Sequence, residues 1–127
     1  MRIKGSIGQS STIVLVNSGS THNFISEELA SRVGLQPVKE GKLQVVMASG
    51  EKLSSNGKCS NVKLYLQGVP IFVDFYLLQL EGYDIVLGVQ WLRTLGQILW
   101  DFTKLQMRFK IASKEVCFKE SPCQLTN

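Results

Sequence analysis

The sequence predicts an all-β protein, and two observations carry this prediction. Short runs of apolar and β-branched residues recur along the chain, separated by turn segments that contain glycine. Only two short stretches, 26–34 and 89–96, have a helical pattern. At 127 residues the chain is long enough for one domain that buries roughly two-thirds of its unfolded surface. We expect the domain to cover residues 1–120 and residues 121–127 to form a C-terminal tail.

The first predicted element is a hairpin. Ile3 and Ile7 alternate with polar residues over 1–7, which is the period-two pattern of a strand with one buried face. Gly8-Gln9-Ser10 then turns the chain into a β-branched run over 12–16, which we expect to form the second strand.

A short helix is expected over 26–34. Ser26 is a suitable N-cap, because its side-chain oxygen can accept a hydrogen bond from a free backbone N–H at the helix start. Glu27 and Glu28 favour the first turn, where the helix dipole is positive. Gly34 can end the helix, since a positive φ is common just after a helix C-terminus.

The middle of the chain is expected to form a hairpin and then a further strand. A strand is predicted over 42–48, Ser49-Gly50 supplies a tight turn, and the chain returns from Leu53. Asn56-Gly57 is compatible with two structures: a two-residue hairpin turn, or a glycine bulge inside one long strand.

The second half of the chain continues this alternation of strands and turns. Residues 62–66 alternate apolar and polar side chains, and Gln67-Gly68 turns the chain into 69–78. This second run is apolar on both faces, which is typical of a strand in a closed barrel or near an interface. The remaining predicted elements are a loop at 80–83, a buried strand at 84–88, a helix at 89–96 with Trp91, Leu92 and Leu95 inward, and strands near 97–100 and 105–111.

Charge and cysteine content argue against several classes of function. The formal net charge is +4, but lysines and arginines are scattered singly, so direct nucleic-acid binding is not expected. No apolar stretch approaches the roughly 20 residues of a membrane helix, and the first residues lack the apolar segment of a signal peptide. Cys59, Cys117 and Cys123 form no CxxC pair, which argues against a disulfide framework and a zinc site. We therefore expect reduced thiols, no metal or other cofactor, and an intracellular, cytoplasmic protein.

The most informative motif is Asn17-Ser18-Gly19-Ser20, which follows the predicted strand at 12–16. With Asp at position 17 it would be the Asp-Ser-Gly signature of an aspartic protease. Two further motifs follow in order: Ala48-Ser49-Gly50-Glu51 at the expected hairpin tip, and Ile85-Val86-Leu87-Gly88 before the second helix. Each motif is weak alone. Together, at these separations, they make the chain resemble the retropepsin-like protease domain of gypsy-type LTR-retrotransposon polyproteins, particularly those of plants, from about Met1 to Phe109.

This resemblance implies a fold and an oligomeric state. A retropepsin-like domain is a closed β-barrel with a flap hairpin and one or two short helices. Its peptide hydrolysis needs two carboxylates about 3 Å apart that share one proton. Because the chain has a single Asn-Ser-Gly loop, the resemblance implies a homodimer in which each copy supplies one loop. It also favours the glycine bulge over the hairpin at Asn56-Gly57.

The resemblance also assigns roles to residues. The catalytic residues that it implies are Asn17, Ser18 and Gly19, with the Ser18 hydroxyl bonding across the pair of loops. The substrate-binding residues that it implies are Ser20, Thr21, Ala48, Ser49, Gly50 and Glu51, the last four at the tip of a flap that closes over an extended peptide. The strand 85–88 is expected to support the catalytic loop from beneath.

Asn17 departs from the family at the reacting residue. Its amide neither ionises nor takes up a proton near neutral pH, so a homodimer would lose both groups of its general acid–base pair. We expect no detectable peptidase activity but retained dimerisation. Asp74, Asp84 and Asp101 do not precede Ser/Thr-Gly and are expected at surface or turn positions.

Three functions remain open. The first is an aspartic endopeptidase domain that processes a retroelement polyprotein and is inactive as written because of Asn17. The second is a catalytically dead pseudoprotease that acts as a dimeric peptide-binding or assembly module. The third is a small β-barrel binding module such as an OB-like fold, which the spacing of the loop and flap motifs disfavours. Activity after the single change Asn17→Asp separates the first from the second.

Overall fold

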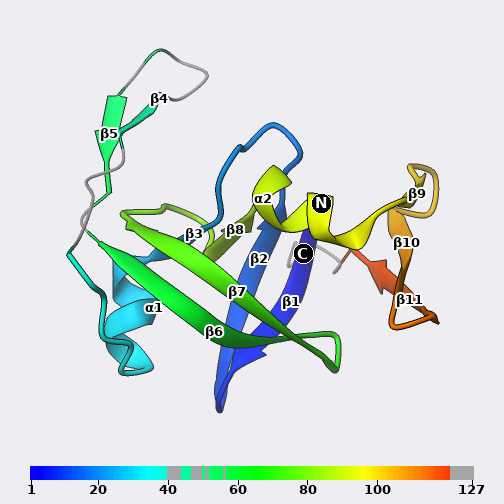
Figure 1. The fold of residues 1–127 in the computed structure, drawn as a ribbon, viewed down its shortest axis with the longest axis horizontal. Helices are drawn as coiled ribbons and strands as arrows, with labels where there is room; N and C mark the ends of the chain where they lie inside the picture. The colour runs from blue at the N-terminus through cyan, green and yellow to red at the C-terminus, as the bar shows by residue number, and fades with distance from the viewer. Residues whose placement is uncertain (40–43, 47–49, 51, 56, 121–127) are drawn as a thin grey trace, which may run out of the picture.

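The computed structural model describes residues 1–39, 44–46, 50, 52–55 and 57–120. Six strands form a closed barrel, which confirms the all-β prediction (Figure 1). In barrel order they are β1 (Arg2–Ile7), β2 (Ser10–Val16), β8 (Ile85–Leu87), β3 (Phe24–Ser26), β7 (Val69–Leu78) and β6 (Lys58–Leu66).

The other elements lie outside the barrel. Strand β4 (Gln44–Val46) pairs with β5 (Lys52–Ser54), and this hairpin projects from the upper left of the barrel in Figure 1. A separate sheet has the order β11 (Lys114–Lys119), β10 (Gln106–Ile111), β9 (Leu99–Asp101). The helices are α1 (Glu27–Arg32), α2 (Val89–Leu92) and the 3-10 helix η1 (Arg93–Leu95).

The two predicted barrel hairpins are confirmed, and both have turns of two residues. The β1–β2 pair closes at Ile7↔Ser10, and Gly8 in its turn has φ +59°. The β6–β7 pair closes around Gln67-Gly68, whose φ values of +47° and +85° are those of a type I′ turn. This turn type matches the twist of the strands that it joins.

The predicted first helix is confirmed at both ends. The Ser26 hydroxyl accepts a hydrogen bond from the Leu29 N–H at 3.0 Å, as an N-cap does. Gly34 follows the helix with φ +77°. The predicted second helix divides into α2 and η1 and ends at Gly96, with φ +72°.

Asn56 lies outside the described residues, but the long strand predicted to run through Gly57 with a bulge is wrong, because β5 ends at Ser54 and β6 begins at Lys58. The register of β6 against β7 shifts between Cys59 and Val62, where Asn61 has φ +54°. Asparagine tolerates this left-handed conformation, and the Asp74 carboxylate accepts the Asn61 N–H at 2.7 Å. The hairpin alternative also fails, because β5 pairs with β4 while β6 pairs with β1 and β7.

The sequence reading missed strands β3 and β11. Strand β3 has three residues, all buried between β8 and β7, so it is too short for an alternating pattern. Strand β11 follows a turn made by Ala112 and Ser113, whose φ values are +51° and +68°. Neither residue is a usual signal for a turn with positive φ, so the turn was not predicted. Strand β9 also begins two residues later than the predicted 97.

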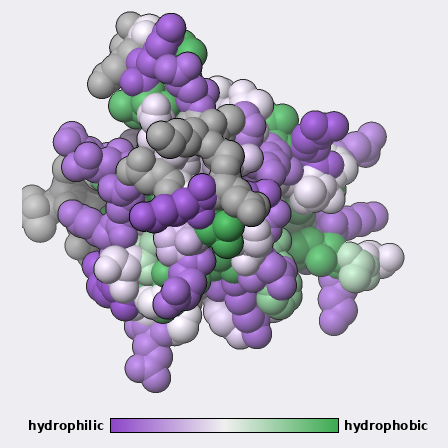
Figure 2. Space-filling model, turned by 60° about the vertical axis from the view of Figure 1, so that its left-hand side comes forward, coloured by the Kyte–Doolittle hydropathy of each residue, from purple (hydrophilic) through white to green (hydrophobic). Residues whose placement is uncertain are grey.

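The core fills the barrel and continues under the helices. Buried apolar side chains from each of the six barrel strands join one cluster, which also takes in Trp91 and Leu92 of α2. Phe109 links this cluster to the outer sheet, since its ring meets Trp91 and Phe118 edge to face. The face in Figure 2 is largely hydrophilic, and its apolar areas are small and separated by polar side chains.

Candidate active site

The loop that follows β2 is a tight turn held by its own backbone and by β8. Asn17 donates its N–H to the Leu87 carbonyl at 3.0 Å, which ties the start of the loop to the end of β8. Its side-chain Oδ1 accepts the Gly19 N–H at 2.9 Å, and its carbonyl accepts the Ser20 N–H at 3.1 Å. A side-chain oxygen at position 17 is therefore part of the turn itself.

The first turn of α2 binds the second half of this loop. Val89 donates its N–H to the Ser20 carbonyl at 2.7 Å, and Gln90 donates to the Thr21 carbonyl at 3.1 Å. A Cβ at Gly88 would lie 2.4 Å from the Ser20 oxygen. Only glycine lets the loop come this close, which explains the glycine in the predicted supporting motif.

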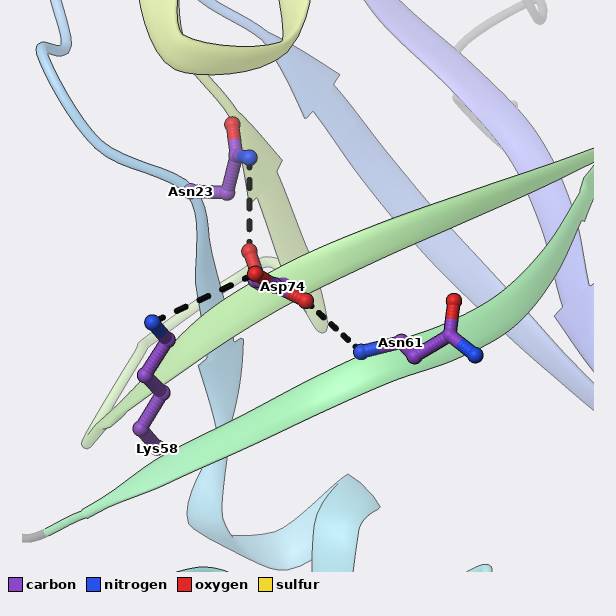
Figure 3. A network of polar contacts seen from close by, with 4 residues as sticks. All are labelled: Asn23, Lys58, Asn61 and Asp74. Carbon is purple, nitrogen blue, oxygen red and sulfur yellow. Dashed lines mark hydrogen bonds and ion pairs between the residues drawn. The ribbon is translucent and has the colours of Figure 1, made fainter.

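Asn23 connects the loop to two distant strands. Its side chain is 2% exposed; its Oδ1 accepts the Gly88 N–H at 2.8 Å, and its Nδ2 donates to the Asp74 carbonyl at 3.3 Å (Figure 3). Both polar atoms of the buried amide are thus paired. This role of Asn23 was not predicted, because a polar residue between His22 and Phe24 gives no local sign of partners 51 and 65 positions away.

The Asp74 carboxylate is occupied by the β6 bulge. One oxygen accepts the Asn61 N–H, and the other lies 4.0 Å from the Lys58 Nζ (Figure 3). Both side chains of this ion pair are well exposed, so the pair contributes little. Asp74 therefore supports the bulge and its carbonyl orients Asn23.

The predicted loop residues lie at one place on the surface of the protomer. Asn17, Ser18, Gly19 and Thr21 are exposed. Ser20 is half-buried, and its hydroxyl donates to the His22 carbonyl at 2.8 Å. The residues predicted to be catalytic are therefore free to meet another molecule, while the Ser20 hydroxyl is already engaged within the loop.

A cavity of about 330 Å³ lies beside Asn17 and Ser18. The β9–β10 turn forms its other wall, where the rings of Trp100 and Phe102 stack 6.3 Å apart. Phe102 is 80% exposed. A large aromatic surface thus stands uncovered next to the loop, as at a surface that a partner covers.

Of Asp74, Asp84 and Asp101, which were expected at surface or turn positions, Asp101 lines this cavity. Its Oδ1 accepts the N–H groups of Lys104 and Thr103, each at 3.0 Å. These bonds, that of Lys104 foremost, lower the pKa of Asp101 below its ordinary value of 3.8. The Asp101 carboxylate is therefore committed to the β9–β10 turn. The Asp84 carboxylate is engaged elsewhere, because it accepts the N–H of Ile13 in β2 at 2.8 Å.

The predicted flap is present as the β4–β5 hairpin. Val45 and Leu53, opposite each other in it, pack against a small apolar cluster formed by Phe24, Leu78 and Val86. Phe24 follows the candidate loop directly, so the hairpin and the loop border the same side of the barrel. At the tip, Gly50 has φ +86°, while the predicted substrate contacts Ala48, Ser49 and Glu51 lie outside the described residues.

The described residues contain neither a metal-binding cluster nor a helix that could span a membrane. No group of three or more His, Cys, Asp or Glu side chains in this part of the chain is placed to hold a metal ion. None of its helices is long and apolar enough to span a bilayer.

Comparison with known proteins gives a family and a fold. A family model described as Retroviral aspartyl protease matches residues 5–122. The structure is similar to the crystal structure of the retroviral protease-like domain of Ddi1 from Leishmania major, with a TM-score of 0.65 and 18% sequence identity. The similarity covers 91% of this chain and 90% of that one, and it confirms the predicted retropepsin-like fold. No curated protein sequence matches the chain.

Proposed function

This chain belongs to the retroviral aspartyl protease family, and from that premise we propose that it is an aspartic endopeptidase domain with its reaction centre at Asn17-Ser18-Gly19. In this proposal residue 17 is the position of the reacting acid. The substrate is an extended peptide of a retroelement polyprotein, held between the loop and the β4–β5 hairpin.

The observation that carries the proposal is the way the loop is held. The Asn17 Oδ1 accepts the Gly19 N–H, and the loop carbonyls bind the start of α2 over Gly88. A carboxylate at position 17 has the same shape and could accept the same bond with one oxygen, leaving the other free. The loop is therefore preorganised to present one acid oxygen outward.

The reaction requires a second copy of the chain. One carboxylate takes a proton from water while its protonated partner polarises the scissile carbonyl, so two acids must share one proton. Each chain supplies one such loop, and a twofold axis beside Asn17 would bring the two together. The exposed loop and the uncovered Phe102 beside it support this arrangement.

Asparagine at position 17 makes the chain inactive in this proposal. The amide occupies the site of the acid and keeps its hydrogen bond to Gly19, so the loop and the dimer are retained. The repulsion between facing carboxylates is also absent. The chain binds peptide without cleaving it.

The second candidate, a pseudoprotease that binds peptides as a dimer, is favoured by Asn17 itself. The loop keeps the hydrogen bond from Gly19 to the side chain of residue 17, yet that residue cannot exchange a proton near neutral pH. Peptide binding follows from both candidates, so binding alone does not separate them.

The single variant Asn17→Asp tests the proposal. It is incubated with a library of peptides from denatured proteins, and cleavage is read by mass spectrometry. We expect the variant to cleave at least about 10²-fold faster than the Asn17 chain, since it regains general acid–base catalysis. Cleavage should be fastest at acidic pH, where the pair shares one proton.

Asn61→Asp is the matched control, because it makes the same chemical change at an exposed site outside the loop. It should remain inactive. Sedimentation of both variants measures the dimer. A dimeric Asn17→Asp variant that binds peptides but cleaves none would exclude the endopeptidase and leave the pseudoprotease.

A further inference from the structure

We propose that the edge of β7 from Pro70 to Asp74 is a docking site for an extended polypeptide segment, which adds to the barrel as a strand. The site lies in a groove that does not include Asn17 or the β4–β5 hairpin. It is independent of the proposed hydrolysis.

The hydrogen bonds of β7 show which way its backbone groups point. Tyr76 donates its N–H to the Asn23 carbonyl at 3.0 Å, and the Asp74 carbonyl accepts from the Asn23 side chain, both on the β3 side. Leu77 instead donates to the Gly57 carbonyl at 2.8 Å, on the β6 side. Backbone groups of successive strand residues point to opposite edges.

By this alternation the backbone groups of Phe72 point away from β6. The same holds for the Pro70 carbonyl and the Asp74 N–H. Among the described residues, β3 pairs with β7 only over Tyr76–Leu78, and no strand pairs with Pro70–Asp74 on this edge. The N–H and C=O of Phe72 are thus presented outward without a strand beside them.

A groove of about 610 Å³ runs along this open edge. The helices α2 and η1 form one wall through Trp91, Thr94 and Leu95, and the end of β10 forms another through Lys110 and Ile111. The edge itself spans five residues, or roughly 17 Å of strand. The open edge along the groove therefore has the length of a short strand.

The chemistry of the groove favours a strand over other occupants. Outward N–H and C=O groups spaced two residues apart match the main chain of another strand, whereas a helix has no free backbone groups to offer them. Phe72 is 61% exposed and offers apolar surface to one face of the added strand. Among the described residues that line the groove, Lys110 is the basic one. It would favour an acidic side chain in the part of the added strand that lies near the β10–β11 turn.

Pro70 provides a natural control for the geometry. Its nitrogen has no hydrogen and points to the same edge as the Phe72 N–H, so proline is already accepted in β7 at this orientation. Phe72→Pro therefore removes the Phe72 N–H, which lies in the middle of the open edge. It leaves the hydrogen bonds between β7 and β6 in place. Phe72→Thr keeps the donor and removes the ring.

The test uses a phage-displayed random nonapeptide library, selected on the full chain and depleted on the Phe72→Pro variant. Peptides that bind the cleft near Asn17 bind both proteins and are removed. We expect the remaining peptides to alternate apolar and polar residues, with acidic residues near one end. The selection itself favours peptides that bind Phe72→Pro weakly, so Phe72→Thr is the informative variant. It lacks the ring but keeps the N–H, and it should bind these peptides at least about tenfold more tightly than Phe72→Pro does, the effect of about one hydrogen bond.

The unchanged chain gives a second readout that needs no variant. On adding a selected peptide, hydrogen exchange of the Phe72 amide should slow at least about tenfold, because that N–H becomes bonded. Val38→Thr, which removes apolar surface from an exposed residue elsewhere, should change neither result. A library that yields no such peptides, or peptides that leave the Phe72 amide unprotected, overturns the proposal. Cleavage by Asn17→Asp is measured separately and is unaffected by this outcome.

Discussion

The buried Asn23 side chain accepts the Gly88 N–H at 2.8 Å and so joins positions 65 residues apart in the chain. Its amide nitrogen bonds the Asp74 carbonyl on the opposite side. One side chain thereby sets the distance between the candidate loop, the start of α2 and β7. The loop that carries Asn17 depends on it.

We expect Asn23→Ala to destabilise the protein by roughly 1–3 kcal/mol, because the Gly88 N–H would be buried without a partner. Urea unfolding measures this change. Asn23→Asp keeps an acceptor for Gly88 but buries a charge and loses the bond to Asp74, so it should also destabilise. A change below about 0.5 kcal/mol in both variants would show that the bridge does not hold the loop.

Gly88→Ala should lower the free energy of unfolding by more than most glycine substitutions do. The added Cβ would meet the backbone oxygens of Ser20 and His22 at 2.4 and 2.5 Å, so the loop itself has to move. We expect about 3 kcal/mol or more of destabilisation, and weaker peptide binding at the loop.

Gly8→Ala is the comparison for this variant. Gly8 has φ +59° but open space around it, so the change costs only the left-handed conformation, roughly 1 kcal/mol. Equal effects of the two substitutions on the midpoint of urea unfolding would contradict the close packing of the loop on Gly88.

Two substitutions in the turn between β10 and β11 should make the protein more stable. Ala112 and Ser113 both adopt left-handed φ values, which Asn and Gly adopt at lower cost. The double variant Ala112→Asn, Ser113→Gly should raise the free energy of unfolding by about 1–2 kcal/mol. Gln67→Asn, in a turn that already contains Gly68, should raise the free energy of unfolding by less. Thermal unfolding compares the two, and a loss of stability in the double variant would refute the type I′ geometry.

Acid should loosen the turn that walls the cavity beside Asn17. The bonds from Lys104 and Thr103 lower the pKa of Asp101 in the folded chain below 3.8. The contribution of the Asp101 carboxylate to the free energy of unfolding is therefore complete well above pH 3.8. It is lost as the pH falls through the lower pKa that this group has in the folded chain. The Asp101→Asn variant lacks this dependence. Unfolding followed by circular dichroism should show the unchanged chain and Asp101→Asn converge in stability as the pH is lowered towards 2. If the difference in stability between the two proteins stays the same at every pH, the carboxylate does not stabilise the turn.

Much of the fold could be predicted because its signals are local. Alternation identified β1 and β6, apolar and β-branched runs identified β2 and β7, and turn residues identified their connections. Ser26 and Gly34 located α1, since a helix cap acts within a few residues. Where the turn residues were unusual, as at Ala112-Ser113, the following strand was missed. The family resemblance favours a bulge at Gly57, whereas the structure has it at Asn61, whose N–H bonds the carboxylate of Asp74, thirteen positions away.

The sequence by itself determined which residues could form the loop at Asn17, the order of the motifs and the family to which they belong. Only the tertiary structure decided that Asn23 holds Gly88, that Asp101 reaches the cavity beside Asn17 and that β7 leaves one edge open. Those relationships are contacts between segments distant along the chain. Local preferences shape each segment, but closure of the barrel selects which segments meet and which backbone groups remain outside.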